Sequence, residues 1–159
     1  MMNIALPPWT GPDASEPFLT REWLETNGRG GYASSTLLNC HTRKYHGLLV
    51  ANLASPPGRY VLLSKFEDSL RLRDREIFLS CHQYPGTFFP DEVLLREFIL
   101  DDYPSFVYTA DLPGPGTAAG VKGGAPADGT VRLRKSILMI DGEDAVLVRY
   151  DLEAGPAGA

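Results

Sequence analysis

The sequence predicts an all-β protein, an antiparallel β-sandwich, and three observations support this fold class. Apolar and polar residues alternate with the period of a strand through most of the hydrophobic segments. Turn-forming residues separate these segments at short intervals, and the 159 residues include 16 glycines and 13 prolines. No segment carries the apolar spacing of a helix longer than about two turns. Short strands joined by turns are typical of sandwiches.

About eight strands can be placed in order along the chain. The segment from Thr20 to Glu25 fits either a strand or a short helix capped by Thr20, and we favour the strand. Arg73-Asp74-Arg75 is expected to turn a hairpin between Leu70 and Leu79, and Asp141-Gly142 to turn another, because Asp-Gly between two apolar runs is a hairpin signal. The other expected strands are Tyr45–Ala51, Tyr60–Phe66 (entered through Pro56-Pro57-Gly58), Leu94–Leu100, Ser105–Leu112, Val131–Met139 and Ala145–Asp151.

A chain of this length fits one domain, which we expect to cover residues 1–159. Within it, residues 113–130 consist almost entirely of small residues, glycine and proline, so we expect a flexible surface loop. The tail at 153–159 has a similar composition and is expected to be frayed.

Composition excludes several classes of function. The formal net charge of −5 argues against nucleic acid as a partner. No apolar run approaches the roughly 18 residues of a membrane span, and the first residues lack the pattern of a signal peptide. We therefore expect a cytoplasmic protein with no membrane partner, and no motif calls for a cofactor.

The two cysteines are each followed by a histidine, as Cys40-His41 and Cys81-His82. A zinc site needs four ligands within tetrahedral reach, whereas adjacent residues of a strand point to opposite faces. We therefore expect no metal site, and two reduced thiols that behave as small apolar side chains.

A first dense polar cluster runs from Asn27 through Gly28, Arg29, Gly30 and Gly31 to Tyr32. It is not a dinucleotide fingerprint, because the sixth position is Ala33 and no helix pattern follows. Two interpretations stay open. The glycines can form a tight loop with positive φ, or the same loop can approach a polar ligand, with the Asn27 amide and the Tyr32 ring as contacts.

A second cluster follows at Thr42 to Gly47 and contains Arg43, Tyr45 and His46. If a strand begins near Thr42, Arg43 and Tyr45 share one face, and His46 lies on the other. A guanidinium suits carboxylates or sugar hydroxyls, and a tyrosine ring can stack on a sugar or pack in the core. The cluster is therefore a candidate ligand site or domain interface, with a purely structural role as the alternative.

Three blocks of sequence carry a resemblance to a known family. They are EWLETNGRGGYAS from Glu22, TRKYHGLLVA from Thr42 and PPGRYVLLSK from Pro56, and they occur in this order. In these blocks the chain resembles the N-terminal domain of the bacterial and archaeal type of glycogen debranching enzyme (amylo-α-1,6-glucosidase). The resemblance is dense from Glu22 to Leu70 and thinner toward Tyr150. It implies a supersandwich-like β-sandwich, and it also favours a strand at Glu22–Leu24.

The resemblance implies a function as well as a fold. Such a domain packs on a C-terminal catalytic (α/α) barrel and lends loops to the rim of a site that hydrolyses α-1,6-linked glucose in α-glucan (glycogen or limit dextrin). The residues expected at that rim or domain interface are Asn27, Gly28, Arg29, Gly30, Gly31, Tyr32, Arg43, Tyr45 and His46.

None of the acidic residues stands in a catalytic setting, although glycoside hydrolysis usually needs two flanking carboxyl groups. In the family those carboxylates belong to the barrel, which is absent from this sequence, so we expect no catalytic residue here and no hydrolysis by this chain alone. The alternative is a stand-alone carbohydrate-binding sandwich. Its stacking residues would come from Trp9, Trp23, Tyr60, Tyr84, Phe88, Phe89 and Tyr103.

The chain also departs from the family pattern. Arg29 stands where an apolar residue is common, Ser35 where glycine is usual, and residues 113–130 resemble an insertion. The family's domain normally continues beyond Leu152, which suggests a truncated or naturally short relative. Such a sandwich would expose strand edges, so we also expect a homodimer formed through them.

Overall fold

The computed structural model describes residues 1–154 apart from 9, 12–15, 73–74 and 113–128. Most of the elements in these residues are short strands, and the described ranges contain a single helix of four residues. In chain order they are β1 (Met2–Ala5), α1 (Glu16–Leu19), β2 (Glu22–Thr26), β3 (Tyr32–Thr36), β4 (Gly47–Ala54), β5 (Pro57–Leu63), β6 (Ser69–Leu72), β7 (Arg75–Phe78), β8 (His82–Tyr84), β9 (Thr87–Phe89), β10 (Leu95–Leu100), β11 (Pro104–Asp111), β12 (Thr130–Met139) and β13 (Val146–Ala154).

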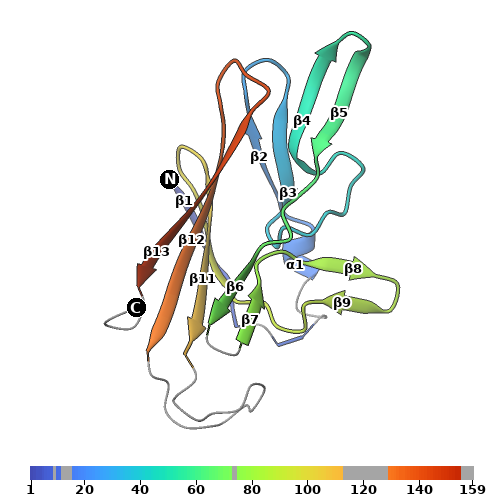
Figure 1. Cartoon of the computed structure of the whole chain (residues 1–159). Helices are drawn as coiled ribbons and strands as arrows, with labels where there is room; N and C mark the ends of the chain where they lie inside the picture. The colour runs from blue at the N-terminus through green and yellow to red at the C-terminus, as the bar shows by residue number, and fades with distance from the viewer. Residues whose placement is uncertain (9, 12–15, 73–74, 113–128, 155–159) are drawn as a thin grey trace.

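The strands form two main antiparallel sheets, which confirms the predicted all-β sandwich. One sheet has five strands in the order β1-β10-β11-β12-β13, and the other has four in the order β2-β3-β4-β5. Two small hairpins, β6-β7 and β8-β9, lie beside them (Figure 1). In the same view the β4-β5 hairpin extends away from the body of the sandwich.

The core lies between the two main sheets and is built around aromatic rings. Trp23 of β2 meets Phe106 of β11 edge to face, with ring centroids 5.6 Å apart, and Phe98 of β10 lies 5.3 Å from the same ring. The Trp23 indole donates to the Thr36 carbonyl oxygen at 3.1 Å, so its polar atom is satisfied in the interior. Alternation in β2 then places Leu24, on the opposite side of the strand from Trp23, on the outer face of the four-stranded sheet.

One charged pair is buried beside this core. Lys135 of β12 is 2% exposed, and its ammonium group donates to Asp68 Oδ2 at 2.6 Å. The Tyr150 hydroxyl donates to the same oxygen at 2.5 Å. A buried charge needs such partners. Because Asp68 and Tyr150 supply them, the Lys135 side chain can point toward the core.

Most predicted strands occur, but several boundaries and elements differ from the prediction. The hairpins at 69–78 and 130–154 are confirmed. The expected strand from Tyr45 is wrong at its start, because residues 43–45 form a turn and β4 begins at Gly47. The strand expected at 60–66 runs instead from Pro57 to Leu63, which an edge strand tolerates because proline needs no ladder donor there.

Strand β3 and the β8-β9 hairpin were not predicted at all. Strand β3 reads Tyr-Ala-Ser-Ser-Thr, without the large apolar residues that mark a strand, yet four of its five residues are buried. Of the predicted loop at 113–130, residues 113–128 lie outside the described residues, and Thr130 begins β12. Of the predicted tail, Glu153 and Ala154 belong to β13, and 155–159 lie outside the described residues.

Candidate functional site

The first polar cluster forms the turn between β2 and β3, and Asn27 is its centre. This side chain is 0% exposed. Its Oδ1 accepts from the backbone N–H groups of Arg29 at 3.0 Å and Gly31 at 2.9 Å. Its Nδ2 donates to the Glu143 carbonyl oxygen at 2.9 Å and to Asp144 Oδ1 at 3.2 Å. Both acceptor positions and both donor hydrogens of the amide are therefore used within the chain.

These bonds tie two turns from different sheets together. The Gly142 N–H donates to the Asn27 carbonyl oxygen at 2.8 Å, and Arg29 Nη1 donates to the Gly142 carbonyl oxygen at 3.0 Å. Gly142 lies in the turn between β12 and β13, so the β2-β3 turn is joined to the end of the five-stranded sheet.

The glycines of this turn are needed for shape and space. Gly28 and Gly30 have φ of +72° and +87°, the region that favours glycine. A Cβ on Gly31 would come within 2.6 Å of Asn27 Nδ2. The glycines thus allow the loop to wrap around the Asn27 amide.

The second cluster lies in the loop before β4, against Glu22 of β2. Arg43 Nε is hydrogen-bonded to Glu22 Oε1, and both side chains are partly exposed. His46 is 5% exposed, and its Nδ1 accepts from the Thr42 N–H at 3.1 Å. Because Nδ1 is an acceptor, the neutral ring carries its hydrogen on Nε2.

The Nε2 atom of His46 is buried and makes no hydrogen bond with a described residue. It lies 3.4 Å from Glu22 Oε1, close enough for an ion pair if the ring is protonated but without hydrogen-bond geometry. Burial lowers the pKa of His46, and the nearby Glu22 carboxylate only partly opposes this shift. The ring is therefore neutral near pH 7 and holds one unused donor.

Tyr45 lies at the surface of this loop and is 43% exposed. The Lys44 ammonium lies 5.2 Å from the centroid of its ring. The Tyr32 hydroxyl donates to the Tyr45 carbonyl oxygen at 3.3 Å, so the two clusters meet through this contact. The sequence prediction that Arg43 and Tyr45 share a strand face is wrong, because both residues lie in the turn at 43–45.

A third group of titratable residues, which sequence reasoning missed, lies near the second cluster. Lys65 Nζ contacts His82 Nδ1 at 3.1 Å, and His82 Nε2 contacts Glu67 Oε2 at 2.7 Å. The only sign of this third group in the sequence was the pair of dipeptides Cys40-His41 and Cys81-His82. Burial is the main cause that lowers the pKa of His41 to about 4 and raises the pKa of Cys81 to about 12. Among the described residues, no group of His, Cys, Asp and Glu is placed to hold a metal ion.

Several acidic side chains are paired with basic side chains. Glu22 pairs with Arg43, Glu92 with Arg75 and Glu97 with Arg132. Glu67 and Asp68 pair with Lys65 and Lys135.

The aromatic residues considered for sugar stacking differ in exposure, and Tyr103 is half-buried. Trp23 and Phe88 are buried at 3% and 6% exposure, whereas Tyr60, Tyr84 and Phe89 are exposed. Tyr84 stacks on His82 with ring centroids 5.8 Å apart, and Phe89 packs edge to face on Phe78. Trp9 lies outside the described residues. The exposed rings come from two separate hairpins, β4-β5 and β8-β9.

Comparison with known proteins identifies the family. A family model described as glycogen debranching enzyme N terminal matches residues 21–159. No curated protein and no solved structure matched in the same comparisons. Within the described part of the chain, no helix is both long enough and apolar enough to cross a membrane. The family match takes in both polar clusters and every strand from β2 to β13. The chain therefore belongs to the family of glycogen debranching enzyme N-terminal domains.

Proposed function

We propose that this domain is an accessory, non-catalytic layer of a debranching enzyme. It docks on a catalytic (α/α) barrel through the outer face of its four-stranded sheet, and its second cluster contributes to the rim of the site that cleaves α-1,6 branches of glycogen or limit dextrin. A cytoplasmic location and the absence of a nucleic-acid partner remain part of this proposal.

The observation that carries the proposal is the mixed character of that outer face. Leu24 is 56% exposed there. Val61 is 38% exposed. It lies on the same face as Leu24, because the strand register pairs Val61 with Val50, Val50 with Tyr32, and Tyr32 with Thr26, which is two positions from Leu24 in β2. Val50, which lies between Val61 and Tyr32 in this register, is 0% exposed, so the two exposed side chains stand on the edge strands β2 and β5 and would meet a partner that spans the sheet.

Polar groups with spare hydrogen-bonding capacity lie at the edge of the same face. Glu22 points to the side that Leu24 occupies, because the two residues are two positions apart in β2. Its partners Arg43 and His46 therefore lie on the side of the sheet that Leu24 occupies, and His46 Nε2 finds no hydrogen-bond acceptor among the described residues. The Arg43 side chain is 69% exposed and bonds Glu22 through Nε, so its terminal nitrogens can reach a partner or a sugar hydroxyl.

Hydrogen exchange of the full chain with and without the separately produced barrel tests the docking. We expect slower exchange at residues 22–26, 41–47 and 59–63 when the barrel is added. Leu24→Arg should abolish this protection. Leu62→Arg is the matched control, because Leu62 is 55% exposed but neighbours Val61 and so points to the other face of β5. Unchanged exchange in all three segments would contradict the proposal.

The proposal also includes association through strand edges. Strands β5 and β13 are each hydrogen-bonded on one side only in the described sheets, and Leu147 and Leu152 of β13 are 48% and 60% exposed. Such edges can pair with another copy of the chain. We expect a homodimer at high concentration, and light scattering that reports a monomer throughout would remove this part.

A further inference from the structure

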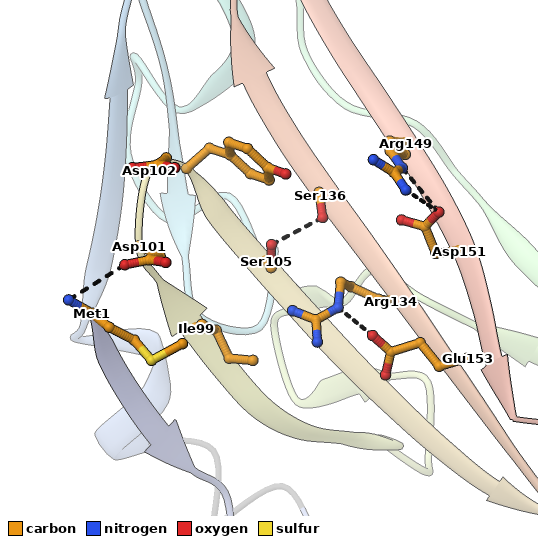
Figure 2. Close-up of a pocket in the computed structure, with 11 residues that line it drawn as sticks. Met1, Ile99, Asp101, Asp102, Ser105, Arg134, Ser136, Arg149, Asp151 and Glu153 are labelled. Atoms are coloured by element: carbon orange, nitrogen blue, oxygen red, sulfur yellow. Dashed lines mark hydrogen bonds and ion pairs between the residues drawn. The ribbon is translucent and has the colours of Figure 1, made fainter.

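An open pocket lies on the outer face of the five-stranded sheet, in the opposite layer from the proposed docking face. Its volume is about 410 Å³ (Figure 2). A row of directly opposed residues crosses the strands there, from Ile99 to Ser105, Ser136 and Arg149. Opposed residues point to the same face, and the neighbour of Ser105, Phe106, lies in the core, so the row faces outward.

The floor of this pocket combines an apolar side chain with two hydroxyl groups. Ile99 is 8% exposed, and Ser105 and Ser136 are each 4% exposed. The two serine Oγ atoms lie 2.9 Å apart, and either can be the donor. Because one hydroxyl group donates to the other, the second keeps its hydrogen for another acceptor.

The walls carry charged groups that keep unused hydrogen-bonding positions. Arg134 bonds Glu153 through Nε, and within the described part of the chain its two terminal nitrogens make no other hydrogen bond. Arg149 bonds Asp151 Oδ1 through Nε and Nη2, which leaves Asp151 Oδ2 available. Figure 2 shows both pairs at one end of the pocket, on β12 and β13. Asp101 and Asp102 lie at the other end, in the turn between β10 and β11.

The charge of the lining restricts the class of ligand. Three cationic groups, Arg134, Arg149 and the N-terminal ammonium of Met1, face the four carboxylates of Asp101, Asp102, Asp151 and Glu153. The ammonium lies 3.4 Å from Asp101 Oδ1, so the lining keeps a small excess of negative charge that disfavours a phosphate or another anion. No metal-holding group occurs among the described residues. The volume falls within the roughly 300–1,000 Å³ of small-molecule sites, and donors and acceptors are interspersed. These features suit a neutral ligand with many hydroxyl groups.

We propose that this pocket is a second carbohydrate-binding site that holds a segment of α-glucan chain away from the catalytic barrel. Sugar hydroxyls accept from Arg134 and Arg149 and donate to Asp102 and Asp151, while a sugar ring covers Ile99. The choice of α-glucan among neutral oligosaccharides rests on the proposed function. Because the pocket and the docking face lie on opposite layers, both can be occupied at once.

Titration of the full chain with maltotetraose, followed by amide NMR shifts, tests the site. We expect saturable shifts at residues 99–105, 134–136 and 149–151 with a Kd on the order of 1 mM. Arg134→Ala should weaken binding at least about fivefold, and Asp102→Asn, in an exposed turn, provides a second variant if the first is poorly folded. Arg59→Ala is the matched control, because this exposed arginine lies on β5 of the other sheet.

Three outcomes would overturn the site. They are absence of shifts at these residues, shifts confined to residues 22–47, or stronger binding of inorganic phosphate at the same residues. Leu24→Arg should leave maltotetraose binding unchanged while it abolishes barrel docking. Failure of the pocket and failure of the proposed function can therefore be told apart.

Discussion

The two polar clusters look alike in sequence but differ in the folded protein. In the turn around Asn27, the amide makes four hydrogen bonds within the chain and the side chain is 0% exposed. In the loop around His46, the buried Nε2 makes no hydrogen bond with any residue that the structure describes, and Tyr45 is 43% exposed. The amide of the first cluster has all its hydrogen-bonding positions used, whereas the second cluster leaves the exposed side chains of Arg43 and Tyr45 for a partner or ligand.

This difference separates stability from recognition. A turn that joins two sheets through one buried amide should be sensitive to small changes, because each lost bond leaves a partner unsatisfied. A half-exposed loop should tolerate substitution, because water replaces what is removed. The comparison therefore predicts large stability effects at Asn27 and small ones at Arg43.

The largest effect is expected for Asn27→Asp. An aspartate can still accept from Arg29 and Gly31, but it cannot donate to Glu143 and Asp144, and it places a charge beside the Asp144 carboxylate. We expect the free energy of unfolding, measured in urea, to fall by about 3–5 kcal/mol. Asn52→Asp is the control, because Asn52 makes one long bond of 3.4 Å at an exposed site. Equal losses in the two variants would contradict a central role for Asn27.

The second effect tests whether the glycines exist to admit the Asn27 amide. Gly31→Ala places a Cβ within 2.6 Å of Asn27 Nδ2 and should cost about 2–3 kcal/mol of unfolding free energy. In an Asn27→Ala background the clashing atom is gone, so the same change should cost less than about 1 kcal/mol. Additive losses in the double variant would show that the cost has another origin.

Sequence reasoning could predict much of the fold, because the apolar strands from Leu94 onward and the Asp141-Gly142 turn carry local signals. It could not predict β3, because the four residues after Tyr32 in this strand are small and are buried only by tertiary packing. The role of Asn27 was equally hidden. Its partners Glu143 and Asp144 are 116 and 117 residues away, and a local pattern cannot report such contacts. Lys135 points inward for the same reason, because Asp68 is 67 residues away.

A third prediction concerns acid. The His41 ring lies 5.8 Å from His46, near Lys65, His82 and Glu67, and its pKa falls from 6.5 to about 4 in the folded protein. Below pH 6.5 the unfolded chain binds a proton that the folded chain does not, so stability should be lost as pH falls from 6.5 toward 4. The lowered pKa of His46 acts in the same direction.

Urea unfolding between pH 8 and pH 4.5 measures this loss. His41→Asn should reduce the slope below pH 6.5, and the difference between the two proteins at pH 8 isolates the cost of the substitution itself. An unchanged slope would show that the acid sensitivity does not come from His41.

The smallest change in stability is expected at Arg43. Its ion pair with Glu22 is largely exposed, so Arg43→Ala should lower the free energy of unfolding by less than about 1 kcal/mol. In a debranching enzyme that carries this domain, the same change should raise KM for branched dextrin about tenfold, which corresponds to one lost charged hydrogen bond of about 1.4 kcal/mol. Lys44→Ala is the matched control, because its ammonium only lies over the Tyr45 ring. A large loss of stability with an unchanged KM would make the second cluster a brace like the first, and the contrast between the two regions would disappear.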